Sequence, residues 1–194
     1  MPASASRLPR SIIISAPSGA GKTTIVNHLL EAQPRLAFSI SATTRAPRPG
    51  EQHGEDYYFL SQEAFRQSIQ EDAFVEYEQV YEGRYYGTLR SELERIRQAG
   101  GFPLFDVDVK GGLRLKELFG TKGLSIYIRP PSLEELQRRL ERRGESPEEI
   151  KKRLSRAEYE LQQATAFDAI VLNDKLEEAV QQVVKEVNQF IGKE

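Results

Sequence analysis

Cysteine is absent from this 194-residue sequence, which also lacks tryptophan and has only two histidines, His28 and His53. Without cysteine the chain forms no disulfide bond, no thiolate zinc site and no cysteine nucleophile. Neither histidine belongs to a metal-ligand spacing. No apolar run approaches the roughly 20 residues of a membrane helix, and residues 1–10 lack the apolar core of a signal peptide. We therefore expect a cytoplasmic protein with no membrane partner, whose residues 1–10 form a flexible tail.

Strong charge of either sign is also missing, because 27 lysine and arginine residues face 29 aspartate and glutamate residues. The formal net charge of −2 gives no electrostatic reason to expect a nucleic-acid partner. The apolar and charged fractions are those of an ordinary globular protein, and the length suits one domain. We expect that domain over residues 11–194, and the sequence leaves its oligomeric state open.

A glycine-rich segment between a strand-like run and a helix-like run predicts a phosphate-binding P-loop. The run Ile12–Ile14 precedes it, and the loop comprises Ala16, Pro17, Ser18, Gly19, Ala20, Gly21, Lys22, Thr23 and Thr24. Its glycines let backbone N–H groups turn toward a phosphate. Lys22 would reach the β- and γ-phosphates, and the Thr23 hydroxyl would bind Mg²⁺. Ala16 stands where the motif has glycine, and it would be strained if its φ were positive.

Strand-like and helix-like segments alternate along the chain, which predicts an α/β fold with a parallel sheet flanked by crossover helices. The later strands that we expect are Ala37–Ser41, Pro103–Asp108, Leu124–Ile128 and Ala169–Leu172. Between them, residues 56–87 contain short strands that we interpret as antiparallel, which indicates an inserted subdomain.

Helix starts near the end of the chain are marked by capping residues. Ser132 and Ser146 each precede a glutamate by three residues, which is typical of a capping box. Asp174 is expected to cap a terminal helix over Leu176–Ile191. The basic residues around Gly144 indicate either ordinary helix-surface ion pairs or a cationic lid.

A proline-stiffened loop carries Arg45 and Arg48, three residues apart. Planar guanidinium groups suit phosphate recognition, and Tyr57 and Tyr86 would add hydroxyl donors to the same anion. The alternative is a solvated basic loop, since surface charge is common.

Several segments, in order and at matched spacing, resemble the guanylate kinase family from Ile12 to about Ile191. They are Phe38–Ser41, Thr43–Arg48, Gly54–Phe59, Phe74–Tyr77, Tyr85–Thr88, Asp106–Asp108 with Gly111, and Val171–Asp174. The resemblance implies the reaction ATP + GMP → ADP + GDP, with Mg²⁺, in purine nucleotide metabolism. It also implies a P-loop NTPase-type sheet as the core (11–41, 88–131 and 157–194), a GMP-binding region (42–87) and a helical lid (about 132–156).

The same resemblance assigns roles at the acceptor site. Glu76 would accept hydrogen bonds from the N1–H and N2 amino groups of guanine, which adenine does not offer as a pair. The hydroxyls of Ser41 and Thr88 would face the base, with Asp108 nearby. The GMP phosphate would be bound by Arg45, Arg48, Tyr57 and Tyr86.

Around the triphosphate, the resemblance places Asp106 toward the metal with Thr23, and Asn173 at the nucleotide. Arg143 and Arg153 match the family's lid arginines. Stabilisation of the transferring phosphoryl group would fall to Lys22, Arg45, Arg143 and Arg153.

Two other functions stay open at this point. One is a kinase of the same fold that acts on another phosphorylated acceptor, such as a ribose bisphosphate. The other is a non-catalytic guanylate-kinase-like scaffold module that binds protein partners. Glu76 with Ser41 and Thr88 argues for guanine, and the Lys22-Thr23 pair argues for catalysis.

Overall fold

The computed structural model describes residues 8–192, except for the side chains of Val80 and Tyr81. Most of the predicted tail, residues 1–7, therefore lies outside the described residues. The last residue of the predicted tail is Arg10, whose guanidinium group donates a hydrogen bond to the Phe190 carbonyl oxygen at 3.2 Å and lies over the Phe190 ring. Arg10 is thus held against helix α7 (Leu176–Ile191), and a flexible tail would have to end before this residue.

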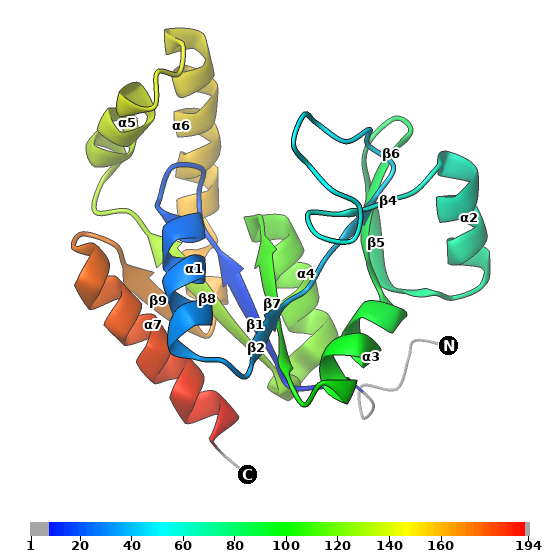
Figure 1. Cartoon of the computed structure of the whole chain (residues 1–194). Helices are drawn as coiled ribbons and strands as arrows, with labels where there is room; N and C mark the ends of the chain where they lie inside the picture. Colours follow the sequence, from blue (N-terminus) through cyan, green and yellow to red (C-terminus); the bar gives the residue numbers. More distant parts are fainter. Residues whose placement is uncertain (1–7, 193–194) are drawn as a thin grey trace. The chain divides into compact units, whose positions relative to one another are not determined.

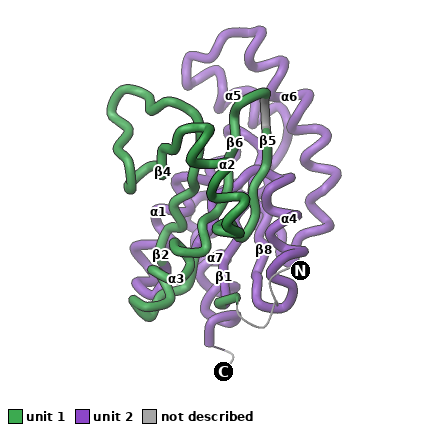
Figure 2. Tube along the Cα trace, turned by 90° about the vertical axis from the view of Figure 1, so that its right-hand side faces the viewer, with its two compact units in different colours: residues 1–9, 37–103 green, residues 10–36, 104–194 purple. Residues whose placement is uncertain are grey.

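The chain divides into two compact units (Figure 2). Unit 1 comprises residues 1–9 and 37–103, and unit 2 comprises residues 10–36 and 104–194. The predicted GMP-binding region, 42–87, falls within unit 1. The finer division of the rest into core and lid stays a prediction.

Unit 2 contains most of the residues of a five-stranded sheet in the order β2-β7-β1-β8-β9 (Figure 1). Its strands are β1 (Ser11–Ser15), β2 (Leu36–Phe38), β7 (Phe102–Val107), β8 (Gly123–Arg129) and β9 (Ala169–Leu172). Strand β1 pairs in parallel with β7 and β8, and β8 pairs in parallel with β9. The α/β fold with a parallel sheet is thus confirmed.

Helices α1 (Lys22–Ala32), α4 (Val109–Phe119) and α7 flank this sheet (Figure 1). Ile12, Ile13 and Ile14 of β1 are all 0% exposed, because both faces of the sheet are covered. That burial explains why the strand is an uninterrupted apolar run rather than an alternating one.

Helix α4 is absent from our sequence-based prediction. It begins after Asp108, whose Oδ1 accepts a hydrogen bond from the Gly111 N–H at 2.9 Å. Gly111 and Gly112 lower the intrinsic helix propensity of the segment, so the periodic apolar residues that follow them do not suffice to predict a helix. Glycine is required at 112, since a Cβ there would lie 2.2 Å from the Ser15 hydroxyl oxygen.

Helices α5 (Leu133–Arg142) and α6 (Pro147–Gln162) begin at the predicted caps. The Ser132 and Ser146 hydroxyls each accept a hydrogen bond from a first-turn N–H, and Ser146 forms a complete capping box with Glu149. The prediction for Asp174 is wrong. The capping position of α7 is Lys175, which makes no side-chain capping bond, because Asp174 lies one residue too early.

Unit 1 contains a four-stranded sheet in the order β4-β3-β6-β5. Its strands are β3 (Ala42–Thr43), β4 (Tyr58–Phe59), β5 (Phe74–Tyr81) and β6 (Arg84–Leu89), with helices α2 (Gln62–Gln70) and α3 (Arg90–Gln98). Strands β5 and β6 are antiparallel as expected, but β3 and β4 are parallel. One face of the sheet packs on α2 through Ala42, Phe65 and Phe74.

No helix within residues 8–192 has both the length and the apolar character to cross a membrane.

Candidate active site

The glycine loop between β1 and α1 turns as a P-loop does. Gly19 and Gly21 have φ values of 92° and 91°, and Gly21 caps α1, which starts at Lys22. Ala16 is not strained, because among the described residues other than glycine only Asp72 has a positive φ. The departure from the glycine pattern at Ala16 therefore leaves the loop geometry intact.

Asn173, at the end of β9, holds this loop in place. Its side-chain Nδ2 donates a hydrogen bond to the Ala20 carbonyl oxygen at 2.7 Å. Its backbone carbonyl oxygen accepts a hydrogen bond from Arg139 at 3.0 Å. The fit is tight, since a Cβ on Gly21 would lie 2.4 Å from Asn173 Nδ2. Asn173 thus contacts the backbone of the predicted nucleotide loop.

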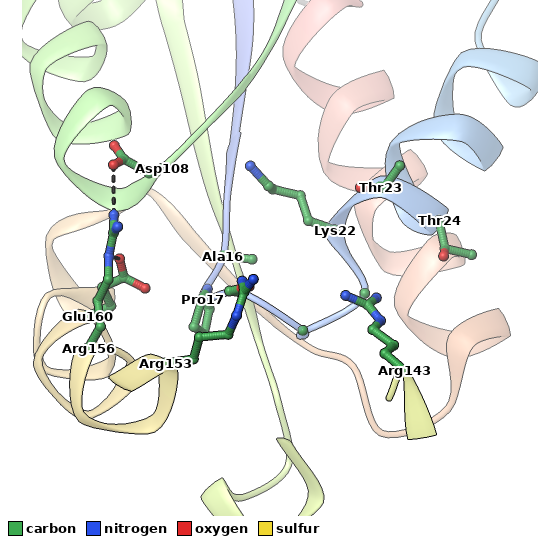
Figure 3. Close-up of a pocket in the computed structure, with 13 residues that line it drawn as sticks. Ala16, Pro17, Lys22, Thr23, Thr24, Asp108, Arg143, Arg153, Arg156 and Glu160 are labelled. Carbon is green, nitrogen blue, oxygen red and sulfur yellow. Dashed lines mark hydrogen bonds and ion pairs between the residues drawn. The ribbon is translucent and has the colours of Figure 1, made fainter. Parts of the chain in front are cut away.

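A cavity of about 360 Å³ opens over the P-loop, entirely within unit 2. Figure 3 shows the Arg143 and Arg153 guanidinium groups pointing toward the loop, and Arg153 contacts the Ser18 hydroxyl. Four cationic side chains line the cavity, which makes it suited to a polyanion such as a triphosphate. Its lining residues are Ala16, Pro17, Ser18, Gly19, Gly21, Lys22, Thr23, Thr24, Asp108, Arg143, Arg153, Arg156 and Glu160.

Lys22 points from the start of α1 to the end of β7. Its ammonium group donates to the Val107 carbonyl oxygen at 2.8 Å and forms an ion pair with the Asp106 carboxylate. The neighbouring Thr23 hydroxyl group belongs to an exposed residue at the cavity. Lys22 and Thr23 thus line the cavity at the start of the helix, and Lys22 connects it to Asp106 on the adjacent strand.

Oxygen ligands suit Mg²⁺, which proteins commonly hold through one or two side chains together with substrate phosphates. Thr23 and Asp106 offer a hydroxyl and a carboxylate of this kind. Within residues 8–192 no three histidine or carboxylate side chains are grouped closely enough to hold a metal by themselves. The hydroxyl and carboxylate therefore fit a magnesium ion that is held jointly with nucleotide phosphates.

Arg156 and Glu160 are cavity residues that are missing from our predicted site. Arg153, Arg156 and Glu160 lie at helical spacing on one face of α6, and this periodicity could have revealed them. Arg156 pairs with Glu160 at 2.6 Å and with Asp108 at 2.8 Å (Figure 3). Burial raises the pKa of the Glu160 carboxyl above its usual range, although the Arg156 guanidinium opposes the rise.

The predicted acceptor residues of unit 1 form a row across its sheet. Glu76 on β5 is directly opposite Thr88 on β6, and Ala42 on β3 is opposite both Gly87 and Tyr58. Extending those pairings by one residue aligns Ser41 with Thr88 and with Tyr57. Side chains opposite each other in a sheet share one face. We name the four positions, Tyr57, Ser41, Thr88 and Glu76, the acceptor row.

Arg45 lies beside the Tyr57 end of the acceptor row. Its guanidinium carbon is 5.2 Å from the Tyr57 ring centroid, and the rings of Tyr57 and Tyr86 are 6.2 Å apart. Glu51, which is not in our predicted site, accepts two hydrogen bonds from Arg45, at 2.8 and 2.9 Å. Three of the four predicted phosphate-binding residues therefore lie together, and the fourth, Arg48, donates its backbone N–H to Glu51 at 2.7 Å.

The other end of the row carries a carboxylate and a hydroxyl in contact. Thr88 Oγ1 donates to Glu76 Oε1 at 2.9 Å, and Thr88 is only 2% exposed. A carboxylate held in this way can accept further hydrogen bonds from a ligand that offers adjacent donors. The end at Glu76 is thus suited to a base, and the end at Arg45 to a phosphate.

Asp108 is brought together with the residues of unit 2. Besides capping α4 through Oδ1, it pairs with Arg156 through Oδ2 at the P-loop cavity. Its predicted place near the acceptor base stays a prediction.

Comparisons with known proteins cover most of the chain. A family model described as guanylate kinase matches residues 8–190. The chain is similar to the guanylate kinase of Salinibacter ruber, at 51% identity over 182 residues, which cover 93% of this chain and 96% of that protein. It is also similar to that of Porphyromonas gingivalis, at 50% identity over 188 residues, covering 96% and 100%. Among solved structures, the guanylate kinase of Anaplasma phagocytophilum matches with a TM-score of 0.71 and 31% identity, covering 94% of this chain and 86% of that one.

Proposed function

This chain belongs to the guanylate kinase family and phosphorylates GMP with ATP, and we propose that its two clusters divide that work. The cavity of unit 2 holds the triphosphate of ATP. The acceptor row of unit 1 holds GMP. The observation that carries this proposal is the separation of the polar residues into a cationic cavity on a P-loop and a row that has a carboxylate at one end and an arginine at the other.

ATP binds in this proposal with its phosphates on the P-loop. The backbone N–H groups around Gly19 and Gly21, together with the start of α1, provide a positive cradle for an anion. Lys22 binds the β- and γ-phosphates, and Thr23 and Asp106 would hold Mg²⁺. That ion would supply neutralisation of the negative charge on the triphosphate.

GMP lies along the acceptor row from phosphate to base. Arg45, Arg48, Tyr57 and Tyr86 bind the phosphate, and the aromatic rings around Arg45 support its guanidinium plane. Glu76 accepts from the two adjacent donors of guanine, with Ser41 and Thr88 beside it. The row crosses three interstrand intervals, about 14 Å in total, which gives an extended mononucleotide room along it.

Phosphoryl transfer asks little covalent chemistry of the protein. An oxygen of the GMP phosphate is already an anionic nucleophile, so it attacks the γ-phosphorus without a general base. The bond from that phosphorus to the β,γ-bridging oxygen breaks, and ADP leaves. Charge that spreads over the transferring group is stabilised by Lys22, Arg143 and Arg153. Closure of the lid over ATP would exclude water and so prevent hydrolysis.

The experiment that tests this function measures ADP release with ATP, Mg²⁺ and one acceptor at a time: GMP, AMP, CMP or UMP. We expect rapid turnover with GMP and little with the other three. Equal rates with all four acceptors would contradict the role of Glu76. Activity with none of them would contradict catalysis and favour a scaffold module.

Dependence on Mg²⁺ is tested in the same assay by titrating the metal against a fixed ATP concentration. Asp106→Asn should raise the Mg²⁺ concentration needed for half-maximal rate, because one oxygen ligand has been weakened. An unchanged requirement would remove Asp106 from the proposed metal site. The cytoplasmic location that we expect from the sequence stays a prediction.

A further inference from the structure

A buried carboxylate lies on the side of the unit 1 sheet opposite the acceptor row. Glu92 is on α3, and its side chain is 0% exposed. A buried carboxylate costs free energy unless it is both paired and hydrogen-bonded. The partners of Glu92 therefore indicate what this residue stabilises.

Each oxygen of Glu92 accepts two hydrogen bonds. Oε1 accepts from the Ile40 backbone N–H at 2.9 Å and from Arg95 at 2.8 Å. Oε2 accepts from the Tyr58 hydroxyl at 2.9 Å and again from Arg95 at 2.9 Å. Burial alone would raise the pKa of Glu92, but the hydrogen bonds from Arg95, Ile40 and Tyr58 outweigh it and hold the pKa below its usual range. The fold thus favours the ionised form of the Glu92 carboxyl group.

Two of these partners are chain neighbours of the acceptor row. Ile40 immediately precedes Ser41, and Tyr58 immediately follows Tyr57. Successive side chains of a strand point to opposite faces, so Tyr58 reaches Glu92 from the face opposite the one that carries Tyr57. The third connection is covalent, because α3 begins directly after β6, which carries Thr88. One carboxylate therefore joins the segments that carry three of the four residues in the row.

We propose that Glu92 is a positioning residue for the acceptor site, which holds Ser41 and Tyr57 in register with Thr88 before GMP binds. The inference rests on the proposed assignment of the acceptor row. Without this link, binding of GMP would have to order the segments itself, and that cost would weaken its affinity. ATP binds to residues of unit 2, so its affinity should not depend on Glu92.

Helix α3 offers a matched control for this experiment. Glu94 forms an ion pair with Arg97 at the same three-residue spacing as the Glu92–Arg95 pair, but its side chain is 46% exposed. It accepts hydrogen bonds from Arg97 and Gln98, both at the end of the same helix. Glu94→Gln therefore removes the same kind of charge pair without touching the segments of the acceptor row.

Steady-state kinetics on Glu92→Gln, Glu94→Gln and the unaltered protein give the decisive comparison. We expect Glu92→Gln to raise the KM for GMP about 10-fold, with kcat and the KM for ATP changing less than about twofold. Glu94→Gln should leave all three parameters within about twofold of the unaltered protein. Tyr58→Phe, which removes one hydrogen bond and keeps the ring in the core, should raise the KM for GMP by a smaller factor.

An effect of Glu92→Gln on the KM for GMP no larger than that of Glu94→Gln would overturn the positioning role. So would an equal rise in the KM values for GMP and ATP, because that would mean general loosening of the fold. If Glu92→Gln does not fold, Tyr58→Phe decides by the same criterion. Tyr57→Phe separates this inference from the acceptor assignment. An unchanged KM for GMP in Tyr57→Phe contradicts both the acceptor assignment and the positioning role of Glu92. If the KM for GMP rises in Tyr57→Phe but not in Glu92→Gln, only the role of Glu92 is contradicted.

Discussion

Lys22 forms an ion pair with Asp106 while its ammonium group donates a hydrogen bond to the Val107 carbonyl oxygen at 2.8 Å. The lysine proposed to bind the triphosphate is therefore paired with the carboxylate proposed to bind the metal. In the proposed function, Lys22 would exchange the Asp106 carboxylate for phosphate oxygens, and Asp106 would exchange the Lys22 ammonium group for Mg²⁺. Neither charge would then be left without a partner of opposite sign.

Replacement of Lys22 by alanine should abolish turnover and leave the fold intact. We expect kcat to fall about 10³-fold, because a cation that neutralises the transferring phosphoryl group is lost. The protein should still fold, although its melting temperature should fall, since the mostly buried Asp106 carboxylate loses its ion-pair partner. ADP release and thermal melting measure the two effects. The control is Lys185→Ala on α7, and a Lys22→Ala variant that retains a rate near that of this control would contradict the assignment.

Much of the donor site could be predicted from the sequence because its chemistry is local. The loop from Ala16 to Thr24 contains its own glycines, cation and hydroxyl, so spacing alone indicates a phosphate site. Glu160 lies on a helix more than 130 residues further along the chain, so loop spacing does not indicate it, and only its helical spacing from Arg153 places it on the same face as a predicted site residue. A solvated glutamate and a buried one look alike in a single sequence.

The acceptor site was predicted through family resemblance rather than through periodicity. Strands β3 and β4 have two residues each, too few for an alternating pattern to be visible. The pairing of β4 with β3, and of β3 with β6, depends on tertiary contacts such as those of Phe65 with the sheet. The resemblance supplied residues such as Glu76, but the register that aligns them in one row became apparent only in the structure.

Glu76 should discriminate GMP from inosine monophosphate, which lacks the 2-amino group. In the unaltered protein, Glu76 accepts one hydrogen bond fewer from inosine monophosphate than from GMP. The kcat/KM for inosine monophosphate should therefore be lower than the kcat/KM for GMP. Glu76→Gln should lower kcat/KM for GMP by about 10²-fold or more, because the amide replaces one acceptor oxygen with an NH2 donor that faces a donor of guanine. The preference for GMP over inosine monophosphate should shrink in this variant while the KM for ATP is unchanged. A preserved preference would show that another residue reads the 2-amino group.

The ion pair of Arg45 with Glu51 should make a pH-dependent contribution to stability. The Arg45 hydrogen bonds and the Arg48 N–H lower the pKa of Glu51 from 4.5 to about 2. A carboxyl whose pKa is lower in the folded state stabilises the fold above its unfolded pKa, and this stabilisation is lost as the pH falls through the folded value. The melting temperature of Glu51→Gln should therefore lie below that of the unaltered protein at neutral pH. The difference should shrink between pH 4.5 and about 2, and a difference that stays constant over this window would contradict the pairing.

Gly21→Ala should damage the P-loop by two separable effects. Its φ of +91° disfavours any residue with a Cβ, and that Cβ would lie 2.4 Å from Asn173 Nδ2. Gly100 has a φ of +73°, but a Cβ at this position would meet nothing within 4 Å. Gly100→Ala therefore reports the strain alone, about 1 kcal/mol.

Thermal melting should therefore show a larger loss for Gly21→Ala than for Gly100→Ala, and only Gly21→Ala should raise the KM for ATP. Adding Asn173→Ala removes the clash but also the hydrogen bond to Ala20. Because the two residues share this contact, the double variant should lose less stability than the sum of the two single variants. Strict additivity would contradict the clash, because it would mean that the new Cβ and the Asn173 side chain avoid each other without loss of stability.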